Sequence, residues 1–148
     1  MNKLTNIKPD DFKTDIFKLW AKDWLLLTAG DFAGNDFNCM TIAWGSFGIM
    51  WGEPFIQVVV RPQRYTYEFM EKYDNFTVCA FPDEFKKDLS LLGTKSGRDG
   101  NKLAETKLTA IASEIVGSPS FKEAELILEC KKTFSSQMKV ENFLDPKT

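Results

Sequence analysis

The stretch Phe55-Ile56-Gln57-Val58-Val59-Val60-Arg61-Pro62-Gln63-Arg64-Tyr65-Thr66 contains the clearest predicted strand of the chain, followed by the predicted start of a helix. Residues 55–60 are rich in β-branched side chains, which favour a pleated, half-buried strand. Pro62 ends the strand, because proline cannot donate a hydrogen bond to a central ladder. Thr66 is suited to cap a helix that runs to Tyr73. Two arginines therefore stand at a strand-to-helix junction.

The flanking sequence predicts further strands with short helices inserted among them. Apolar runs with strand character lie at 24–29, 37–44, 75–81, 108–116 and 124–134, and residues 49–51 predict a short strand or loop after a break at Gly45-Ser46-Phe47-Gly48. Helices are predicted over 9–22 and 82–92, the second with Gly93 as its C′ residue, and a helical turn over 103–107. Because regular helices do not separate the strands, the pattern argues against a doubly wound parallel sheet. We expect a mainly β fold with inserted short helices, arranged as an antiparallel barrel.

Length and composition limit the domain count and the chemistry. The 148 residues, at 16.9 kDa, suffice for one core but not for two comfortable domains, so we expect a single domain over residues 1–148. Histidine is absent, which excludes Ser-His-Asp hydrolases, Cys-His proteases and zinc catalysis with histidine ligands. The three cysteines, Cys39, Cys79 and Cys130, form no Cys-x-x-Cys pair. We expect no metal site, and free thiols in the core of a protein from a reducing compartment.

Charge and hydropathy argue against two classes of partner. The formal net charge is −2 and the pI is near 5.3, whereas a non-specific nucleic-acid binder is usually basic. Residues 1–11 contain no apolar segment of the kind found in secretory signals. The longest apolar runs, such as residues 24–27, are too short to span a bilayer. We expect a cytoplasmic protein with no nucleic-acid partner and no membrane segment.

The segment Asn38-Cys39-Met40-Thr41-Ile42-Ala43-Trp44-Gly45 carries polar residues that are unusual for a buried strand. Strand alternation puts one set of side chains on one face (Asn38, Met40, Ile42, Trp44) and a second set on the other (Cys39, Thr41, Ala43). Gly45, at the strand end, would let the backbone approach a flat ligand closely. The alternative is an ordinary half-buried strand, in which threonine is a good strand former.

Two further segments are suited to an anion. Arg61 and Arg64 precede a predicted helix N-terminus, where free N–H groups and forked guanidinium donors favour phosphate; the alternative is a pair of solvated loop charges. Residues 93–102 mix small and basic residues, so their N–H groups could converge into an anion-binding nest, with Lys95, Arg98 and Lys102 as counter-charges. This segment matches neither the P-loop nor the dinucleotide-binding pattern, and its alternative is a flexible surface loop.

Three motifs in this order resemble those of the flavin reductase-like family of FMN-binding split barrels. They are Asn38-x-Met40-Thr41-x-x-Trp44-Gly45, Arg61-Pro62-x-Arg64-Tyr65-Thr66 and Ser96-Gly97-Arg98-Asp99-x-x-Lys102. Leu128-Glu129-Cys130-Lys131 is similar to the Leu-Glu-Cys strand of that family. The resemblance covers residues 23–135.

The resemblance implies a homodimeric split β-barrel, antiparallel and of Greek-key type, that holds FMN near the subunit interface. By motif position, the FMN phosphate would be bound by Thr41, Arg61, Arg64, Thr66, Ser96 and Lys102. The ribityl chain and the ring would lie along Asn38, Ala43, Trp44 and Gly45. Because the flavin supplies the redox chemistry, no side chain is expected to be catalytic. Members of the family continue for a few dozen residues past the position of Thr148, and that part would complete the ring pocket and the dimer contacts.

Three functions fit these expectations. The first is a reductase that passes hydride from NADH or NADPH through FMN to free flavin, ferric iron or a partner protein such as an oxygenase. The second is an FMN-bearing electron carrier without its own nicotinamide site. The third is a split-barrel binding module without flavin, because a fold alone does not fix a function. The basic and glycine-rich segments argue against the third.

Overall fold

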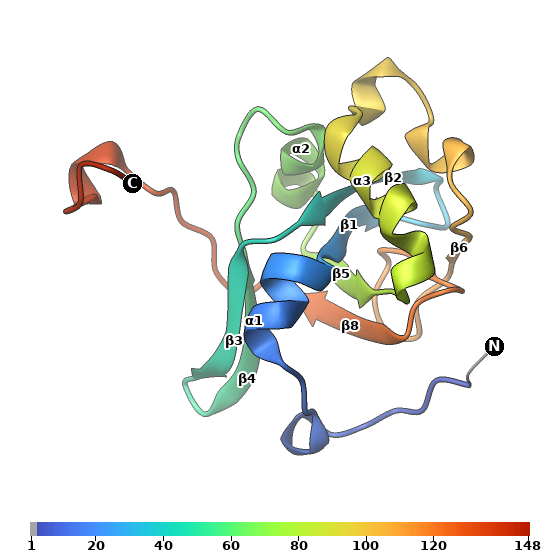
Figure 1. Cartoon of the computed structure of the whole chain (residues 1–148), viewed down its shortest axis with the longest axis horizontal. Helices are drawn as coiled ribbons and strands as arrows, with labels where there is room; N and C mark the ends of the chain where they lie inside the picture. The colour runs from blue at the N-terminus through green and yellow to red at the C-terminus, as the bar shows by residue number, and fades with distance from the viewer. Residues whose placement is uncertain (1–2) are drawn as a thin grey trace.

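A four-stranded antiparallel sheet lies at the centre of the computed structural model, which describes residues 3–148 (Figure 1). Its strands are β1 (Leu25–Asp31), β2 (Asp36–Ile42), β5 (Asn75–Ala80) and β8 (Leu126–Lys131), in the order β2-β1-β5-β8. Met1 and Asn2 lie outside the described residues. They belong to residues 1–11, for which the sequence predicts no secretory signal. No helix within residues 3–148 is long and apolar enough to cross a membrane.

Two hairpins accompany the sheet. One is β3 (Gly45–Met50) with β4 (Glu53–Val58), and the other is β6 (Ala110–Ile111) with β7 (Ser120–Phe121). The predicted break at residues 45–48 is therefore wrong, because these residues pair with β4. The turn of the first hairpin has positive φ at both Trp51 (50°) and Gly52 (79°), as a type I′ turn requires.

The helices lie close to the predicted segments, and the first of them is shorter than predicted. They are α1 (Ile16–Lys18), continued by the π-helical turn η2 (Leu19–Asp23), then α2 (Tyr65–Lys72) and α3 (Lys86–Thr94). Turns of 3₁₀ helix are η1 (Pro9–Asp11), η3 (Asp83–Phe85), η4 (Gly97–Asp99), η5 (Lys102–Glu105) and η6 (Val140–Asn142).

Three helix predictions need correction. A single helix over residues 9–22 is wrong: Phe12 lies between two helical turns and packs edge-on against Phe47, with ring centroids 5.6 Å apart. Thr66 does not cap α2, because Arg64 holds the N-cap position and Thr66 is buried within the first turn. Gly93 is not a C′ residue, since α3 continues through it to Thr94.

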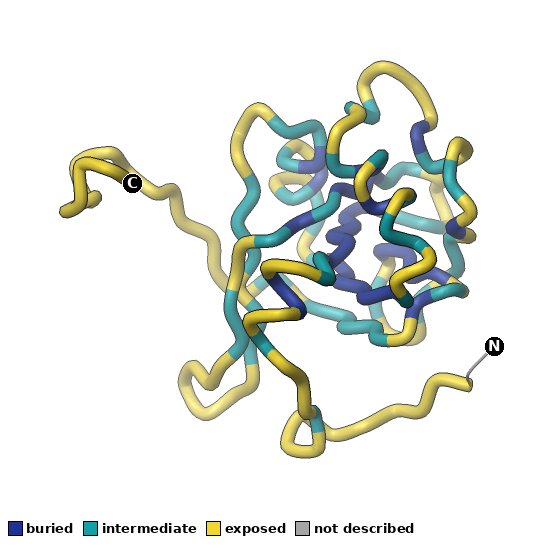
Figure 2. Tube along the Cα trace, viewed as in Figure 1, coloured by how far each residue is buried: buried dark blue, intermediate teal, exposed yellow. Residues whose placement is uncertain are grey.

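The sheet buries both of its faces (Figure 2). One face packs against α2 and contains Leu25, Leu27, Met40 and Ile42, together with Phe69 of the helix. The other face packs against α3 and contains Leu26, Cys39 and Cys79, together with Leu89 and Leu92 of the helix. The alternation predicted for the strand that begins at Asn38 is confirmed for its core positions. Each fully buried leucine contributes about 1.5–3 kcal/mol relative to an exposed one.

The cysteines are free thiols in these cores, as predicted. Cys39 and Cys79 are buried and Cys130 is partly buried. Burial raises the thiol pKa to about 11 for Cys39 and to about 12 for Cys79 and Cys130. A thiol must ionise to act as a nucleophile, so these side chains pack as small apolar groups.

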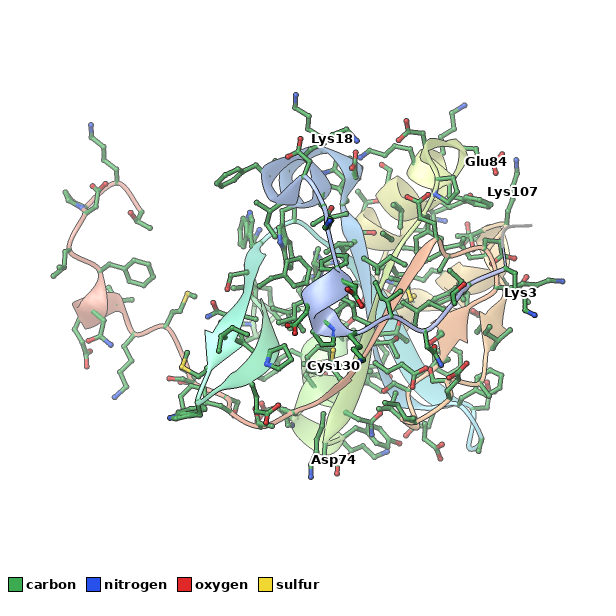
Figure 3. The ribbon with its side chains drawn as sticks, turned by 90° about the horizontal axis from the view of Figure 1, so that it is seen from below. Lys3, Lys18, Asp74, Glu84, Lys107 and Cys130 are labelled. Carbon is green, nitrogen blue, oxygen red and sulfur yellow. The ribbon has the colours of Figure 1, made fainter. Side chains whose placement is uncertain are left out.

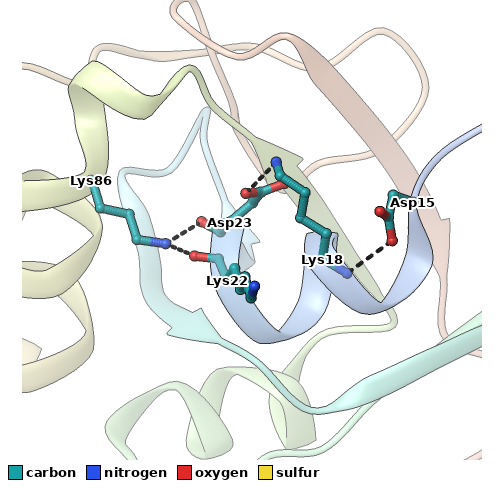
Figure 4. Close-up of polar contacts among 5 residues, drawn as sticks. All are labelled: Asp15, Lys18, Lys22, Asp23 and Lys86. Atoms are coloured by element: carbon teal, nitrogen blue, oxygen red, sulfur yellow. Dashed lines mark hydrogen bonds and ion pairs between the residues drawn. The ribbon is translucent and has the colours of Figure 1, made fainter.

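Lys86, at the start of α3, links α3 to the end of the helical turn η2 (Figure 4). Its ammonium donates to the carbonyl oxygens of Lys22 and Asp23, the latter at 3.0 Å, and lies 3.6 Å from the centroid of the Trp24 ring. Carbonyl groups at a helix C-terminus lack an intrahelical partner and attract cations. Lys18 and Asp23 add an ion pair at 2.8 Å within the segment.

Glu129 of β8 holds the loop that precedes β7. Its carboxylate accepts hydrogen bonds from the backbone N–H groups of Glu114, Ile115 and Val116, at 2.8, 2.7 and 3.2 Å. These N–H groups are paired with a side chain and not with a neighbouring strand. The strand predicted over 108–116 is therefore wrong except for β6.

We expect Glu129→Ala to lower the free energy of unfolding by about 2 kcal/mol, because a hydrogen bond to a charged group contributes about 1.5–3 kcal/mol. At about 2–4 °C per kcal/mol for a chain of this size, the melting temperature should fall by about 4–8 °C in thermal denaturation. Glu129→Gln keeps an oxygen acceptor without the charge and should lie between the two. An unchanged melting temperature in Glu129→Ala would contradict this role.

The segment after β8 extends away from the sheet, past the β3–β4 hairpin (Figures 1 and 3). Residues 133–148 are exposed along their whole length, including Phe134, Met138, Val140 and Leu144.

Candidate functional site

Two adjoining hollows meet at Arg64, where β2 ends, α2 begins and α3 ends. The strand-end hollow, of about 200 Å³, is lined by Met40, Thr41, Ile42, Ala43, Trp44, Val59, Arg61 and Arg64. The helix-start hollow, of about 270 Å³, is lined by Asn38, residues 63–66, residues 93–98 and Lys102. Each is smaller than the ~300–1,000 Å³ usual for a ligand pocket, so a ligand of that size would need both.

The structure brings nine of the ten predicted site residues to these hollows. The strand-end hollow takes Thr41, Ala43, Trp44 and Arg61, the helix-start hollow takes Asn38, Thr66, Ser96 and Lys102, and Arg64 borders both.

Gly45 is the exception. A Cβ atom at Gly45 would lie 2.2 Å from the carbonyl oxygen of Gln57 and 2.3 Å from the Trp20 ring. The glycine therefore makes room for Trp20 and for the β3–β4 pairing, which is a different reason from the close ligand approach predicted from the sequence.

Local hydrogen bonds hold the elements of the site together. The Asn38 side-chain amide donates to the Thr66 hydroxyl at 2.8 Å, which ties β2 to α2. The Thr41 hydroxyl donates to the Leu89 carbonyl at 2.5 Å, which ties β2 to α3. Gly97 presses against β2 so closely that a Cβ atom there would lie 2.2 Å from Asn38 Oδ1. This glycine lets the loop after α3 close the helix-start hollow.

The lining of the hollows is strongly basic. All three arginines of the chain line them, together with Lys95 and Lys102, and none of the described lining residues is acidic. Lys95 is paired with Glu105 and Arg98 with Glu68, each at 2.5 Å. Within residues 3–148, Arg61, Arg64 and Lys102 make no ion pair. Three positive charges therefore remain uncompensated at the junction.

Lys102 is the most buried of these cations, at 5% exposure. Its ammonium donates to the carbonyl oxygens of Leu92 at 2.8 Å and Lys95 at 3.0 Å. Burial lowers the Lys102 pKa below its ordinary 10.5, and the charge of Arg64 lowers it further, against an opposing effect of Cys39. A buried ammonium without a counter-ion is costly, so an anion bound here would be held strongly.

Arg64 has unused donors. Its Nη2 group donates to the Gly93 carbonyl at 3.0 Å. Partial burial and the nearby Arg61 lower the Arg64 pKa, although an arginine stays protonated at neutral pH. The guanidinium has five N–H groups, so most of them are free for a ligand.

Arg61 and Arg98 interact with aromatic rings on different sides of the junction. Arg61 lies 5.0 Å from the centroid of the Trp44 ring, at the strand-end hollow. Arg98 lies 4.9 Å from the centroid of Tyr65 and donates to the Gln63 carbonyl at 3.1 Å, across the helix-start hollow. The sequence did not predict these contacts of Arg98 with Tyr65 and Gln63, because the partners are about thirty residues apart and no local pattern joins them.

Comparisons with known proteins identify the family. The family model of the flavin reductase like domain matches residues 21–140. The flavoredoxin of Desulfovibrio vulgaris (Miyazaki F) has a similar structure, with a TM-score of 0.68 at 23% identity over 94% of this chain and 69% of that chain. An FMN-binding domain of a flavin reductases-like enzyme from Shewanella baltica gives 0.66 at 21% identity, over 78% and 60% of the two chains.

A curated relative from Pyrococcus abyssi, an uncharacterized protein, is 31% identical over 66% of this chain and 55% of its own length. The chain spans about half the length of the curated relatives that it matches. The predicted fold is confirmed: a mainly antiparallel sheet with a few short helices, similar to the flavin reductase-like split barrels.

The residues of the site fit a flavin phosphate. Arginine forks, an ammonium and hydroxyl groups are the donors that phosphate oxygens prefer. The buried ammonium of Lys102 and the free N–H groups of Arg64 converge on one hollow that lacks a carboxylate. Within residues 3–148, no group of three or more cysteine, aspartate or glutamate side chains is placed so that it could hold a metal ion.

Proposed function

The chain belongs to the flavin reductase-like family, and on that premise we propose that it binds FMN and passes electrons from NADH or NADPH through the flavin to an acceptor. The phosphate would lie in the helix-start hollow and the ring in the strand-end hollow. The observation that carries this proposal is the set of uncompensated cations, Arg61, Arg64 and Lys102, at the junction of two hollows with no acidic lining.

The side chains have separate roles in this proposal. Arg64, Lys102 and Ser96 would hold the phosphate, while Asn38 and Thr66 keep β2 and α2 in register beside it. The hydroxyl proton of Thr41 is already bonded to Leu89, so Thr41 would fix α3 against β2 and offer the phosphate no proton. Ala43 and Trp44 would border the ring.

The bound flavin would supply the redox chemistry by accepting a hydride. The protein then needs to bind and orient the flavin and to leave one ring face open to the nicotinamide. Such chemistry requires no catalytic side chain of the protein. The chain contains no histidine, and its cysteine thiols have raised pKa values.

An FMN-bearing electron carrier is the second candidate, and the similarity to a flavoredoxin fits it equally well. A single experiment separates the candidates: the purified protein is loaded with FMN, and NADH or NADPH is added without oxygen. Rapid bleaching of the visible flavin bands supports the reductase. A loaded protein that only dithionite bleaches supports the carrier. A protein that takes up no FMN supports a binding module without flavin.

We propose further that the protein is a homodimer. Trp44 (55% exposed) and the hairpin tip of Ile49, Met50 and Trp51 (83% exposed for Trp51) present large apolar side chains to solvent. Monomers seldom tolerate large apolar patches, and a two-fold dimer is the commonest way to cover one.

Light scattering should therefore give twice the chain mass of 16.9 kDa at micromolar concentration. Trp51→Ser should shift the mass toward one chain, because it removes the most exposed side chain of the hairpin tip. Phe17→Ser is the matched control, since Phe17 is equally exposed (84%) but lies on α1. A single-chain mass for the unmodified protein would contradict the dimer.

A further inference from the structure

We propose that Arg61 supplies the positive charge that stabilises the flavin ring once it is reduced, and so raises the reduction potential of the bound flavin. This inference rests on the proposed function. It assigns Arg61 to the ring, whereas the family resemblance placed it with the phosphate.

The position of Arg61 separates it from the phosphate ligands. Arg61 lines the strand-end hollow and does not line the helix-start hollow, which takes Arg64 and Lys102. Its guanidinium lies over the Trp44 ring, 5.0 Å from the centroid, and this cation–π contact favours its position beside the hollow that both residues line.

The charge of Arg61 is not used elsewhere in the described structure. Glu68, on α2, is paired with Arg98 at 2.5 Å. No described ion pair contains Arg61, and its charge is felt across the junction, where it lowers the Arg64 pKa.

The FMN phosphate would not neutralise the positive charge of Arg61. A phosphate monoester carries about −1.5 to −2 charges near pH 7. Arg64 and Lys102, the two uncompensated cations of the helix-start hollow, offset that charge. The positive charge of Arg61 then remains beside the strand-end hollow.

Reduction of the flavin ring would create a negative charge that Arg61 can stabilise. A hydride from a reduced nicotinamide carries two electrons and one proton equivalent, so its addition to the neutral oxidised ring gives a monoanion, and the nicotinamide leaves as its oxidised form. The attraction between a guanidinium and this anion exists only after reduction. Arg61 is exposed, so the attraction exceeds its value in water to the extent that the bound ring covers the guanidinium.

The test measures the affinity of the holoprotein for oxidised and for dithionite-reduced FMN, together with the two-electron midpoint potential. In Arg61→Gln we expect the affinity for oxidised FMN to change by less than about threefold and that for reduced FMN to fall about tenfold. A tenfold change corresponds to a potential about 30 mV lower. Arg61→Lys should keep most of the potential, and Lys107→Gln, which removes an exposed lysine outside both hollows, should leave it unchanged.

Riboflavin separates the ring from the phosphate. The potential of bound riboflavin should fall in Arg61→Gln as that of FMN does, because the proposed charge acts on the ring. Equal losses for oxidised and reduced FMN, an unchanged potential, or a shift seen with FMN but absent with riboflavin would each overturn the assignment. Failure of the unmodified protein to bind any flavin would instead contradict the proposed function, and this inference with it.

Discussion

Arg64→Ala is expected to weaken FMN binding by about tenfold to more than a hundredfold while riboflavin binding stays nearly unchanged. Arg64 borders both hollows and donates one N–H group to the Gly93 carbonyl, so most of its guanidinium N–H groups remain available for the phosphate. A charge-assisted hydrogen bond contributes about 1.5–3 kcal/mol. At about 1.4 kcal/mol per tenfold in affinity, this gives the expected range.

The measurement is a fluorescence titration with the two flavins in parallel. Riboflavin lacks the phosphate and serves as the internal control, since a structural role of Arg64 at the start of α2 would weaken both ligands. Arg64→Lys should keep part of the affinity, because lysine retains the charge but not the fork. Equal losses for FMN and riboflavin would mean that Arg64 acts on the fold and that the phosphate lies elsewhere.

Lys102→Met is expected to weaken FMN binding about tenfold, less than Arg64→Ala. Two of the three ammonium protons of Lys102 are bonded to Leu92 and Lys95, so one remains for a phosphate oxygen. The change removes a buried charge and keeps a side chain of similar length. Ser96→Ala should have a still smaller effect, because a hydroxyl forms a neutral hydrogen bond.

The lowered pKa of Lys102 adds a pH dependence with a definite sign. Between about pH 7.5, above which the phosphate is doubly ionised, and the lowered pKa of Lys102, both charges are constant and the affinity for FMN should be constant. As the pH rises through the lowered pKa toward 10.5, the free protein loses the charge and the affinity for FMN should fall. Riboflavin titrated over the same range corrects for other ionisations. A pH profile that is the same in Lys102→Met and in the unmodified protein would contradict the assignment.

The central sheet could be predicted from the sequence because its signals are local. Strands β5 and β8 lie within the apolar runs predicted at 75–81 and 124–134, and β1 begins in the run predicted at 24–29 and extends two residues beyond it. Where long-range packing decides the local structure, the predictions were wrong. Gly45 was predicted to break a strand, but its missing side chain admits Trp20 and lets β3 form. The loop at residues 114–116 forms no strand because Glu129 takes its N–H groups.

Most of the candidate site could be predicted from three sequence motifs, since each motif sits at the end of one element and the fold brings these ends together. The contacts that define the charge of the site could not. The structure pairs Glu68 with Arg98 and places Arg61 over Trp44, and no local sequence pattern predicts either contact. Which cation remains free depends on side-chain geometry between distant segments.

The central claim is that the junction at Arg64 binds FMN through its phosphate, and FMN retention tests it most directly. The purified protein is mixed with excess FMN, separated from free flavin by gel filtration and examined by visible absorption. We predict one FMN for each chain, and much less riboflavin under the same treatment. A protein that retains no FMN at micromolar concentration, or that retains both flavins equally, would contradict the account.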